Sequence, residues 1–391
     1  MNDRDVVIVE AVRSATGRKN GSLSGVHPVV LLARVLEELM RRAKLPADVV
    51  EDVVAGCVDQ IGDQAANIGR NAVLTAGFPY TIPATTVDRQ CGSAQQAIHF
   101  AANLVQSGVV DAAIGCGVES MSRVPILSPM QDGMAAGHGF PMPPELSEMY
   151  PLVMQGTSAD MIAKQWGISR EDVDKYSYES HMKAARARDE GRFDSEIMPM
   201  KVSLEGVETV FKQDEGIRPD TSPEKLAALK PSFAEDGIHT AGNSSQISDG
   251  ASAVLLMSAA KAKELGVKPR GRIVAQAVVG SEPVLMLTGP ITATPKVLDK
   301  AGLKLGGIDL FEINEAFAAV ILAWEKELHP DMRKVNVNGG AIALGHPLGS
   351  TGAKLMTTLL HELERTGGRY GLETMCCGGG LGTATIIERL G

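Results

Sequence analysis

Cys91 stands where an extended stretch of the chain gives way to a helical pattern. After it, small and apolar residues recur at helical spacing, at Ala94, Ala97, Ala101 and Val105. Free backbone N–H groups and the helix dipole at a helix N-terminus favour a thiolate, so Cys91 is a candidate nucleophile whose own N–H could hold an oxyanion. The alternative for this cysteine alone is a small buried residue at a tight turn.

A second candidate, His346, lies in the glycine-rich stretch 336–350. Pro347 suits the first turn of a helix and keeps the residue before it extended, so the sequence predicts an imidazole held at a turn. A helix N-terminus disfavours the imidazolium, which would leave His346 neutral and able to accept a proton. Asn314, where a strand pattern passes into a helix pattern, could polarise a carbonyl or hold a water. Helix capping is the alternative for both residues.

A third stretch, 373–382, carries Cys376, Cys377 and a run of glycines between two strand patterns. Glycine N–H groups beside a thiol offer another oxyanion site. A vicinal disulfide or a metal site is the rival interpretation, but no C-x-x-C or H-x-x-x-H spacing accompanies the pair. A strand rather than a helix follows the glycines, which is unlike a dinucleotide fingerprint. Two thiols, an imidazole and an amide at strand ends suit acyl transfer through a thioester.

The elements that must position these residues repeat along the chain. Strand, helix and strand patterns lie at 6–9, 29–42 and 53–58 in the first copy and at 272–279, 294–301 and 308–313 in the second. Cys91 and His346 each precede a helix at matching places, which indicates two related α/β halves. Between the halves, residues 121–161 hold seven of 17 methionines and six of 20 prolines, too many prolines for a regular βαβ unit. Such a segment is either flexible filling or an adaptable apolar wall.

Composition narrows the class of protein. With 391 residues, 44% of them hydrophobic and 22% charged, the chain is typical of a globular protein with more than one domain. A net charge of −9 without a basic block argues against nucleic-acid binding. No apolar run approaches a membrane span, and five unevenly spaced cysteines do not suit a disulfide framework. The sequence therefore predicts a reduced protein in the cytoplasm.

The blocks around Cys91, Asn314, His346 and Cys376 occur in the order found in thiolases, and the chain resembles that family over nearly its full length. The resemblance implies an α/β thiolase fold, five-layered αβαβα, from two repeated βαβ-type halves plus an inserted loop domain. It places the first half at 1–120 (completed by about 246–268), the loop domain at 121–245 and the second half at 269–391. It also implies a homodimer or homotetramer.

The same resemblance implies roles for these residues. Cys91 would take the acyl group, His346 would deprotonate Cys91, and Cys376 would activate coenzyme A or abstract the α-proton in condensation. The N–H groups of Cys91 and Gly378 would form one oxyanion site, and His346 with a water on Asn314 would form the other. Coenzyme A would be a co-substrate rather than a permanently bound cofactor, and no metal is implied. The ligand contacts would be Met154, Gln155, Arg218, Thr221, Lys225, Leu226, Phe233, Ala241, Ser245, Ala316 and Phe317.

Met154 and Gln155 stand where acetoacetyl-specific members carry a His-Met pair that lines a short acyl pocket. Its absence predicts a degradative enzyme, which uses coenzyme A to split a 3-ketoacyl-CoA into acetyl-CoA (or propionyl-CoA) and a shortened acyl-CoA. The loop also resembles actinobacterial thiolases of lipid and sterol breakdown, so fatty acid β-oxidation or steroid degradation is expected. The alternatives are an acetoacetyl-CoA thiolase running Claisen condensation, a ketoacyl synthase, which would lack the second cysteine, and a non-catalytic thiolase-like lipid carrier.

Overall fold

A computed structural model describes residues 2–204 and 206–391. The strands are β1 (Val6–Ser14), β2 (Gly17–Arg18), β3 (Asp52–Gly56), β4 (Ala84–Val87), β5 (Ala112–Ser120), β6 (Ile197–Met198), β7 (Met200–Leu204), β8 (Val207–Phe211), β9 (Ser248–Ser258), β10 (Gly271–Gly280), β11 (Leu310–Ile313), β12 (Tyr370–Cys377) and β13 (Leu381–Arg389). The α-helices are α1 (Pro28–Ala43), α2 (Ile68–Thr75), α3 (Ser93–Ser107), α4 (Ser128–Ala135), α5 (Pro144–Met149), α6 (Gln155–Gln165), α7 (Arg170–Asp189), α8 (Pro223–Ala227), α9 (Ala259–Glu264), α10 (Gly289–Ala301), α11 (Ala318–Leu328), α12 (Ala341–Leu344) and α13 (Thr351–Thr366).

The long central sheet consists of two sheets joined by a short seam. At the seam, β1 pairs with β10 in the registers Val7–Arg272 and Ile8–Gly271. The strand order is β4-β3-β5-β9-β1 on one side and β11-β12-β13-β10 on the other. In each half a parallel pair, β3-β5 or β11-β12, is continued by antiparallel strands. The duplication predicted from the sequence is therefore confirmed.

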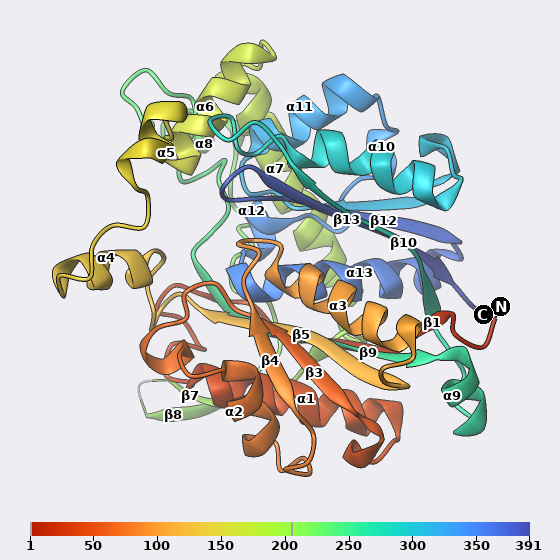
Figure 1. The fold of residues 1–391 in the computed structure, drawn as a ribbon. Coiled ribbons are helices and arrows are strands. Elements are labelled where there is room, and N and C mark those ends of the chain that lie inside the picture. Colours follow the sequence, from red (N-terminus) through yellow and green to blue (C-terminus); the bar gives the residue numbers. More distant parts are fainter. Residues whose placement is uncertain (1, 205) are drawn as a thin grey trace.

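Helices separate and cover the two sheets (Figure 1). α1 packs on β1 and β9, and α2 packs on β3 and β4, so both cover the outer face of the first sheet. α10 covers β10 and β13 of the second sheet, with α11 beside it. α3 and α13 contact each other and lie between the sheets, α3 on β5 and α13 on β9 and β12. The layers alternate as αβαβα, as predicted.

The central position of α13 explains its composition. The helix is buried on every side from Thr351 to Leu363, polar residues included. Because no face meets water, its polar side chains must find partners inside the protein. The Thr357 hydroxyl donates to the Ala353 carbonyl at 2.7 Å, and Lys354 donates to carbonyls of the preceding loop at 3.0 and 2.9 Å. The polar side of this helix is therefore buried as well, and it satisfies its hydrogen bonds within the protein.

The segment 121–245 runs between β5 and β9 and joins the two halves. Its helix α7 contributes Ala184 to the core of the first half and Tyr176 to the core of the second. The helices α4 and α5 project from the body of the protein (Figure 1), and residues 129–150 are mostly exposed. The domain boundaries at 120 and 245 stay a prediction. Within the described residues, no helix combines the length and the apolar character needed to cross a membrane.

Candidate active site

A tight turn between β4 and α3 presents Cys91. The preceding residue, Gln90, has a left-handed backbone with φ 50°, a conformation that non-glycine residues seldom adopt. The Ser93 hydroxyl closes this turn, because it accepts the Arg89 N–H at 2.9 Å and donates to the Gln90 carbonyl at 2.6 Å. Cys91 thus lies just before the N-terminus of α3, as the sequence predicts.

The predicted resting thiolate at Cys91 is wrong. Burial raises the pKa of the Cys91 thiol to about 11, although the N–H groups of Gly378 and of Cys91 itself act in the opposite direction. Desolvation of the charged form therefore outweighs the N–H groups gathered at the helix start. A neutral thiol needs a base before it can attack a carbonyl, which makes the protonation state of His346 decisive.

His346 is held as a neutral base by two contacts on its loop. Its N–H donates to the Ser248 hydroxyl at 3.1 Å, and its Nδ1 lies 2.6 Å from the Thr351 hydroxyl. Because that hydroxyl donates its proton to the Pro347 carbonyl at 2.8 Å, it accepts from Nδ1–H, and Nε2 is left unprotonated. Burial, together with a smaller effect of the Lys354 charge, lowers the pKa of His346 to about 3. The prediction of a neutral His346 is confirmed, with burial rather than a helix dipole as the main cause.

Asn314 completes this part of the cluster. Its Nδ2 lies 3.3 Å from His346 Nε2, across the boundary between β11 and the loop before α13. The Asn314 Oδ1 is buried and has no hydrogen-bond partner among the described residues. A buried amide oxygen without a partner is costly unless a water or a ligand group satisfies it. The geometry therefore suits the predicted water site beside His346.

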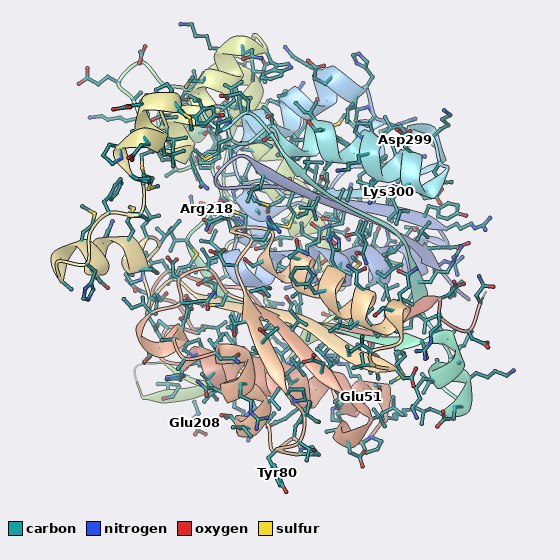
Figure 2. The ribbon with its side chains drawn as sticks, in the orientation of Figure 1. Glu51, Tyr80, Glu208, Arg218, Asp299 and Lys300 are labelled. Carbon is teal, nitrogen blue, oxygen red and sulfur yellow. The ribbon has the colours of Figure 1, made fainter. Side chains whose placement is uncertain are left out.

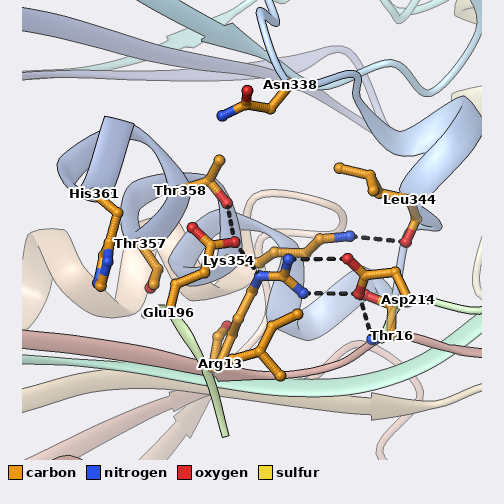
Figure 3. A network of polar contacts seen from close by, with 12 residues as sticks. Arg13, Thr16, Glu196, Asp214, Asn338, Leu344, Lys354, Thr357, Thr358 and His361 are labelled. Atoms are coloured by element: carbon orange, nitrogen blue, oxygen red, sulfur yellow. Dashed lines mark hydrogen bonds and ion pairs between the residues drawn. The ribbon is translucent and has the colours of Figure 1, made fainter. Parts of the chain in front are cut away.

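Lys354 is a residue of the site that the sequence reasoning missed. Figure 3 shows its ammonium donating to the Leu344 carbonyl, at 3.0 Å, and it also donates to the Gly345 carbonyl at 2.9 Å. Both carbonyls directly precede His346. Burial lowers the pKa of Lys354 to about 8, opposed by the nearby Asp214 carboxylate. In the sequence Lys354 lies on the polar side of the helix pattern, with His361 and Arg365, so nothing there distinguishes it from a surface lysine.

A buried carboxylate fixes the other end of the His346 loop. Glu119 on β5 accepts the N–H of Gly349 at 2.8 Å and that of Val58 at 2.9 Å. On the same strand, Gly117 must lack a side chain, because a Cβ there would overlap the Gly349 carbonyl. The chain after His346 therefore packs directly on β5 of the first half, and both halves of the duplicated fold contribute residues to the candidate site.

The hairpin between β12 and β13 carries the second thiol. Cys376 and Cys377 end β12, and the turn continues through Gly379 and Gly380, whose left-handed φ angles are 79° and 74°. Burial raises the pKa of Cys376 well above its ordinary range, with Cys91 adding to the shift. Cys377 packs instead against the nucleophile turn, where a Cβ on Gly92 would lie 2.7 Å from its Sγ. The hairpin therefore brings Gly378 and both thiols to the Cys91 turn.

Some of the predicted ligand contacts gather beside this cluster. The Gln155 amide lies against Gly378, at 2.9 Å from where a Cβ would stand, whereas Met154 is 64% exposed. The Phe233 and Phe317 rings meet edge to face with centroids 5.6 Å apart. The Ser245 N–H donates to the Ala316 carbonyl at 2.9 Å, and Ala241 is exposed nearby in the chain. These residues form a partly apolar surface next to the second half.

The remaining predicted contacts lie at the surface, on and before α8. Arg218 is exposed on the side where the inserted helices project (Figure 2). Lys225 pairs with Asp220 at 3.1 Å, Thr221 donates its N–H to the Arg218 carbonyl at 3.2 Å, and Leu226 is buried. The structure thus brings the cationic residues together on one short stretch but not into the thiol cluster.

The low pKa of His346 predicts an unusual pH profile. A base whose pKa falls from 6.5 to about 3 stays unprotonated as the pH drops through the normal histidine range. We expect kcat/KM, which reports the free enzyme, to show no single-proton loss centred near pH 6.5. Steady-state rates between about pH 5.5 and 8 in buffers of constant ionic strength measure this. A loss centred near 6.5 would mean that His346 is protonated there.

The site combines a buried cysteine beside backbone N–H groups, a neutral imidazole and a second thiol, and it lies on a duplicated αβαβα fold. These groups are typical of an acyltransferase that works through a thioester. Comparison with known protein families agrees with this class. The thiolase N-terminal domain matches residues 6–260, and the thiolase C-terminal domain matches residues 267–389. The chain belongs to the thiolase family.

Individual relatives are similar over nearly the whole chain. The steroid 3-ketoacyl-CoA thiolase of Mycobacterium tuberculosis is 49% identical, with 99% of this chain and 94% of that protein covered. The 3-ketoacyl-CoA thiolase of Bacillus subtilis is 43% identical, with 98% and 99% covered. Among solved structures, the acetyl-CoA acetyltransferase of Bacillus anthracis is 42% identical and has a TM-score of 0.91 over 99% of both chains. The predicted thiolase fold is confirmed.

Proposed function

We propose that this enzyme cleaves 3-ketoacyl-CoA thioesters with coenzyme A, through an acyl-enzyme on Cys91. The observation that carries the proposal is one buried cluster, in which Cys91 packs with Cys377 of the hairpin and with Leu348, two residues after His346. The relatives named as 3-ketoacyl-CoA thiolases support the substrate class. The products are acetyl-CoA (or propionyl-CoA) and a shortened acyl-CoA.

The first half-reaction transfers the acyl group to the enzyme. His346 Nε2 takes the proton of Cys91, and the Cys91 sulfur attacks the 3-keto carbon. The N–H groups of Cys91 and Gly378 are placed to stabilise the oxyanion that forms. The bond between the α and β carbons then breaks, its electron pair goes to the α carbon, and the Cys376 S–H protonates that carbon. Acetyl-CoA leaves, and the shortened acyl group stays on Cys91 as a thioester.

The second half-reaction releases the acyl group. The Cys376 thiolate takes the proton of the incoming coenzyme A thiol, and the coenzyme A sulfur attacks the Cys91 thioester. The C–S bond to Cys91 breaks, and Cys91 regains its proton from the His346 imidazolium. Coenzyme A is a co-substrate in this scheme. We assign its nucleotide end to the exposed Arg218 and Lys225, which give a protein of net charge −9 a local attraction for phosphates.

The acyl site is inferred to be roomy. Met154 and Gln155 start α6 without a bulky ring, and the Met- and Pro-rich segment with α4 and α5 is largely exposed, so little protein crowds this side. An adaptable methionine surface suits long or bulky apolar chains. We therefore assign the enzyme to degradation of fatty acyl or steroid side-chain substrates.

We expect kcat/KM for thiolysis to increase at least about tenfold from acetoacetyl-CoA to long-chain or steroid-sized 3-ketoacyl-CoA, since each buried methylene contributes roughly 0.8 kcal/mol. Loss of the enolate absorbance of the 3-ketoacyl-CoA follows each reaction, with Cys91→Ala as the blank. Cleavage of acetoacetyl-CoA alone would contradict the roomy site. It would favour the second candidate, an acetoacetyl-CoA thiolase running condensation, which the likeness to the Bacillus anthracis acetyl-CoA acetyltransferase supports.

A homodimer or homotetramer also remains our proposal. Light scattering coupled to gel filtration measures the mass in solution against the 41.2 kDa of one chain. A mass of one chain at micromolar concentration would contradict it.

A further inference from the structure

Glu315, the residue after Asn314, has a fully buried carboxylate that the reaction scheme does not use. Two donors reach it from the inserted helix α7. The Tyr176 hydroxyl donates to Oε1 at 2.8 Å, and the Ser180 hydroxyl donates to Oε2 at 2.7 Å. Hydrogen bonds to a buried charged acceptor are stronger than neutral ones. Glu315 thus joins the turn that carries Asn314 to the segment 121–245.

Two further donors come from the chain that leads to His346. Asn336 Nδ2 donates to Glu315 Oε1 at 2.9 Å, and the Ile342 N–H donates to Oε2 at 3.2 Å. Asn336 also binds the backbone of Ile313, the residue before Asn314. The Asn336 Oδ1 accepts the Ile313 N–H at 2.9 Å, and the Asn336 Nδ2 donates to the Ile313 carbonyl at 2.9 Å. The carboxyl group therefore accepts hydrogen bonds on both oxygens from two directions.

The glycine pair before α12 fits this carboxylate. A Cβ on Gly340 would overlap the Glu315 carboxylate, and a Cβ on Gly339 would come within 2.6 Å of the Ser180 carbonyl. Gly339 also has a left-handed φ of 77°. The Gly340 N–H donates to the Ser180 hydroxyl at 3.1 Å, the same hydroxyl that donates to Glu315. The two glycines are therefore required for the chain to lie flat against α7 and Glu315.

We propose that Glu315 is the positioning residue that sets the contact between Asn314 and His346. Glu315 directly follows Asn314, and its carboxyl group accepts the N–H of Ile342, four residues before His346. The 3.3 Å contact between Asn314 Nδ2 and His346 Nε2 lies between these two anchored segments. The inference rests on the proposed function, because it assigns Glu315 a role in the same thiolysis reaction.

The test is Glu315→Gln in the full chain. Glutamine has nearly the same volume as glutamate, but its NH₂ group would face at least one of the four groups that donate to Glu315. Because two donors cannot bond to each other, we expect the Asn314 turn and the chain before His346 to move apart. Misplacement of catalytic groups by about 1 Å can cost about 100-fold. We therefore expect kcat for thiolysis to fall about 100-fold, while KM for coenzyme A changes little, because the proposed nucleotide contacts lie elsewhere.

Glu388→Gln is the matched control. Glu388 is also buried and accepts hydrogen bonds from Arg272 at 2.6 Å and from Arg369 at 2.7 Å, and it lies at the end of β13 that is remote from the thiol hairpin. It should lose stability in urea as Glu315→Gln does and keep kcat within about threefold, as expected for a residue remote from the reacting groups. Ser180→Ala and Tyr176→Phe, which each remove one donor, should lower kcat by smaller factors and keep the inference testable if Glu315→Gln does not fold.

Equal kcat values for wild type and a folded Glu315→Gln variant would overturn the inference. So would equal losses of kcat in the Glu315 and Glu388 variants, since that pattern would reflect stability alone. Failure of the proposed function looks different, because the wild-type enzyme itself would then cleave none of the 3-ketoacyl-CoA substrates.

Discussion

Replacing Cys91 with serine should lower kcat for thiolysis by about 10,000-fold or more. The His346 imidazole, with a pKa of about 3, is a weak base, and it deprotonates Cys91 only with the help of the N–H groups of Gly378 and Cys91. A serine hydroxyl is far less acidic than a thiol, so the same base cannot activate it. Stopped-flow or end-point assays with a 3-ketoacyl-CoA at saturating coenzyme A measure the loss.

Cys116→Ser is the control for this variant. Cys116 is an equally buried cysteine on β5, and its S–H faces the Val54 carbonyl at 3.5 Å, remote from the thiol cluster. The exchange of sulfur for oxygen is identical in the two variants, and only the position differs. Residual activity of Cys91→Ser above about one per cent of wild type would contradict the role of Cys91 as the acyl acceptor.

Replacing Cys376 with serine should lower kcat by about 1,000-fold. In the scheme above this thiol both protonates the departing α carbon and deprotonates coenzyme A, so its loss affects each half-reaction. Burial raises the pKa of Cys376 well above its ordinary range, which keeps it protonated and ready to act as the acid in the first step. Rapid-quench measurement of acetyl-CoA release and of acyl transfer to coenzyme A separates the two losses.

Cys377→Ser is an adjacent control with the same chemistry. The Cys377 thiol belongs to the same hairpin but packs against Gly92, and we expect its variant to keep kcat within about tenfold of wild type. If Cys377→Ser were as inactive as Cys376→Ser, the hairpin would serve as a packing element, and the assignment of Cys376 as the acid and base would fail.

The elements of the fold could largely be predicted from local patterns. The helix expected over 29–42 is α1 (Pro28–Ala43). The strand expected over 53–58 ends at Gly56 instead. The Val58 N–H is taken by the Glu119 carboxylate at 2.9 Å, a partner 61 residues away that no local pattern reveals.

Helix starts were predicted less well. The helix pattern at 294–301 is the second part of α10, which begins at Gly289, with Pro290 in its first turn and Pro295 inside it. α13 begins at Thr351 rather than at His346, after a short 3₁₀ turn (Leu348–Ser350). That turn is what lets the Thr351 hydroxyl reach back to the His346 ring.

The sequence predicts which residues are candidates and that His346 is neutral, but it gives the wrong protonation state for Cys91. Cys91 and His346 stand out by their flanking residues, whereas burial, which raises one pKa and lowers the other, depends on contacts across the whole fold. The supporting groups were missed for a similar reason. Thr351, Lys354 and Glu315 are ordinary residues in the sequence, and only the tertiary structure places them around the His346 loop.

The most direct test of the account is to look for the acyl group on the protein. The enzyme is mixed with a 3-ketoacyl-CoA in the absence of added coenzyme A, quenched in acid, digested and analysed by mass spectrometry. The account predicts that the peptide containing Cys91 gains the mass of the shortened acyl group and loses it again when coenzyme A is added before the quench. An unmodified Cys91 peptide during turnover, or an acyl group on another cysteine, would contradict it.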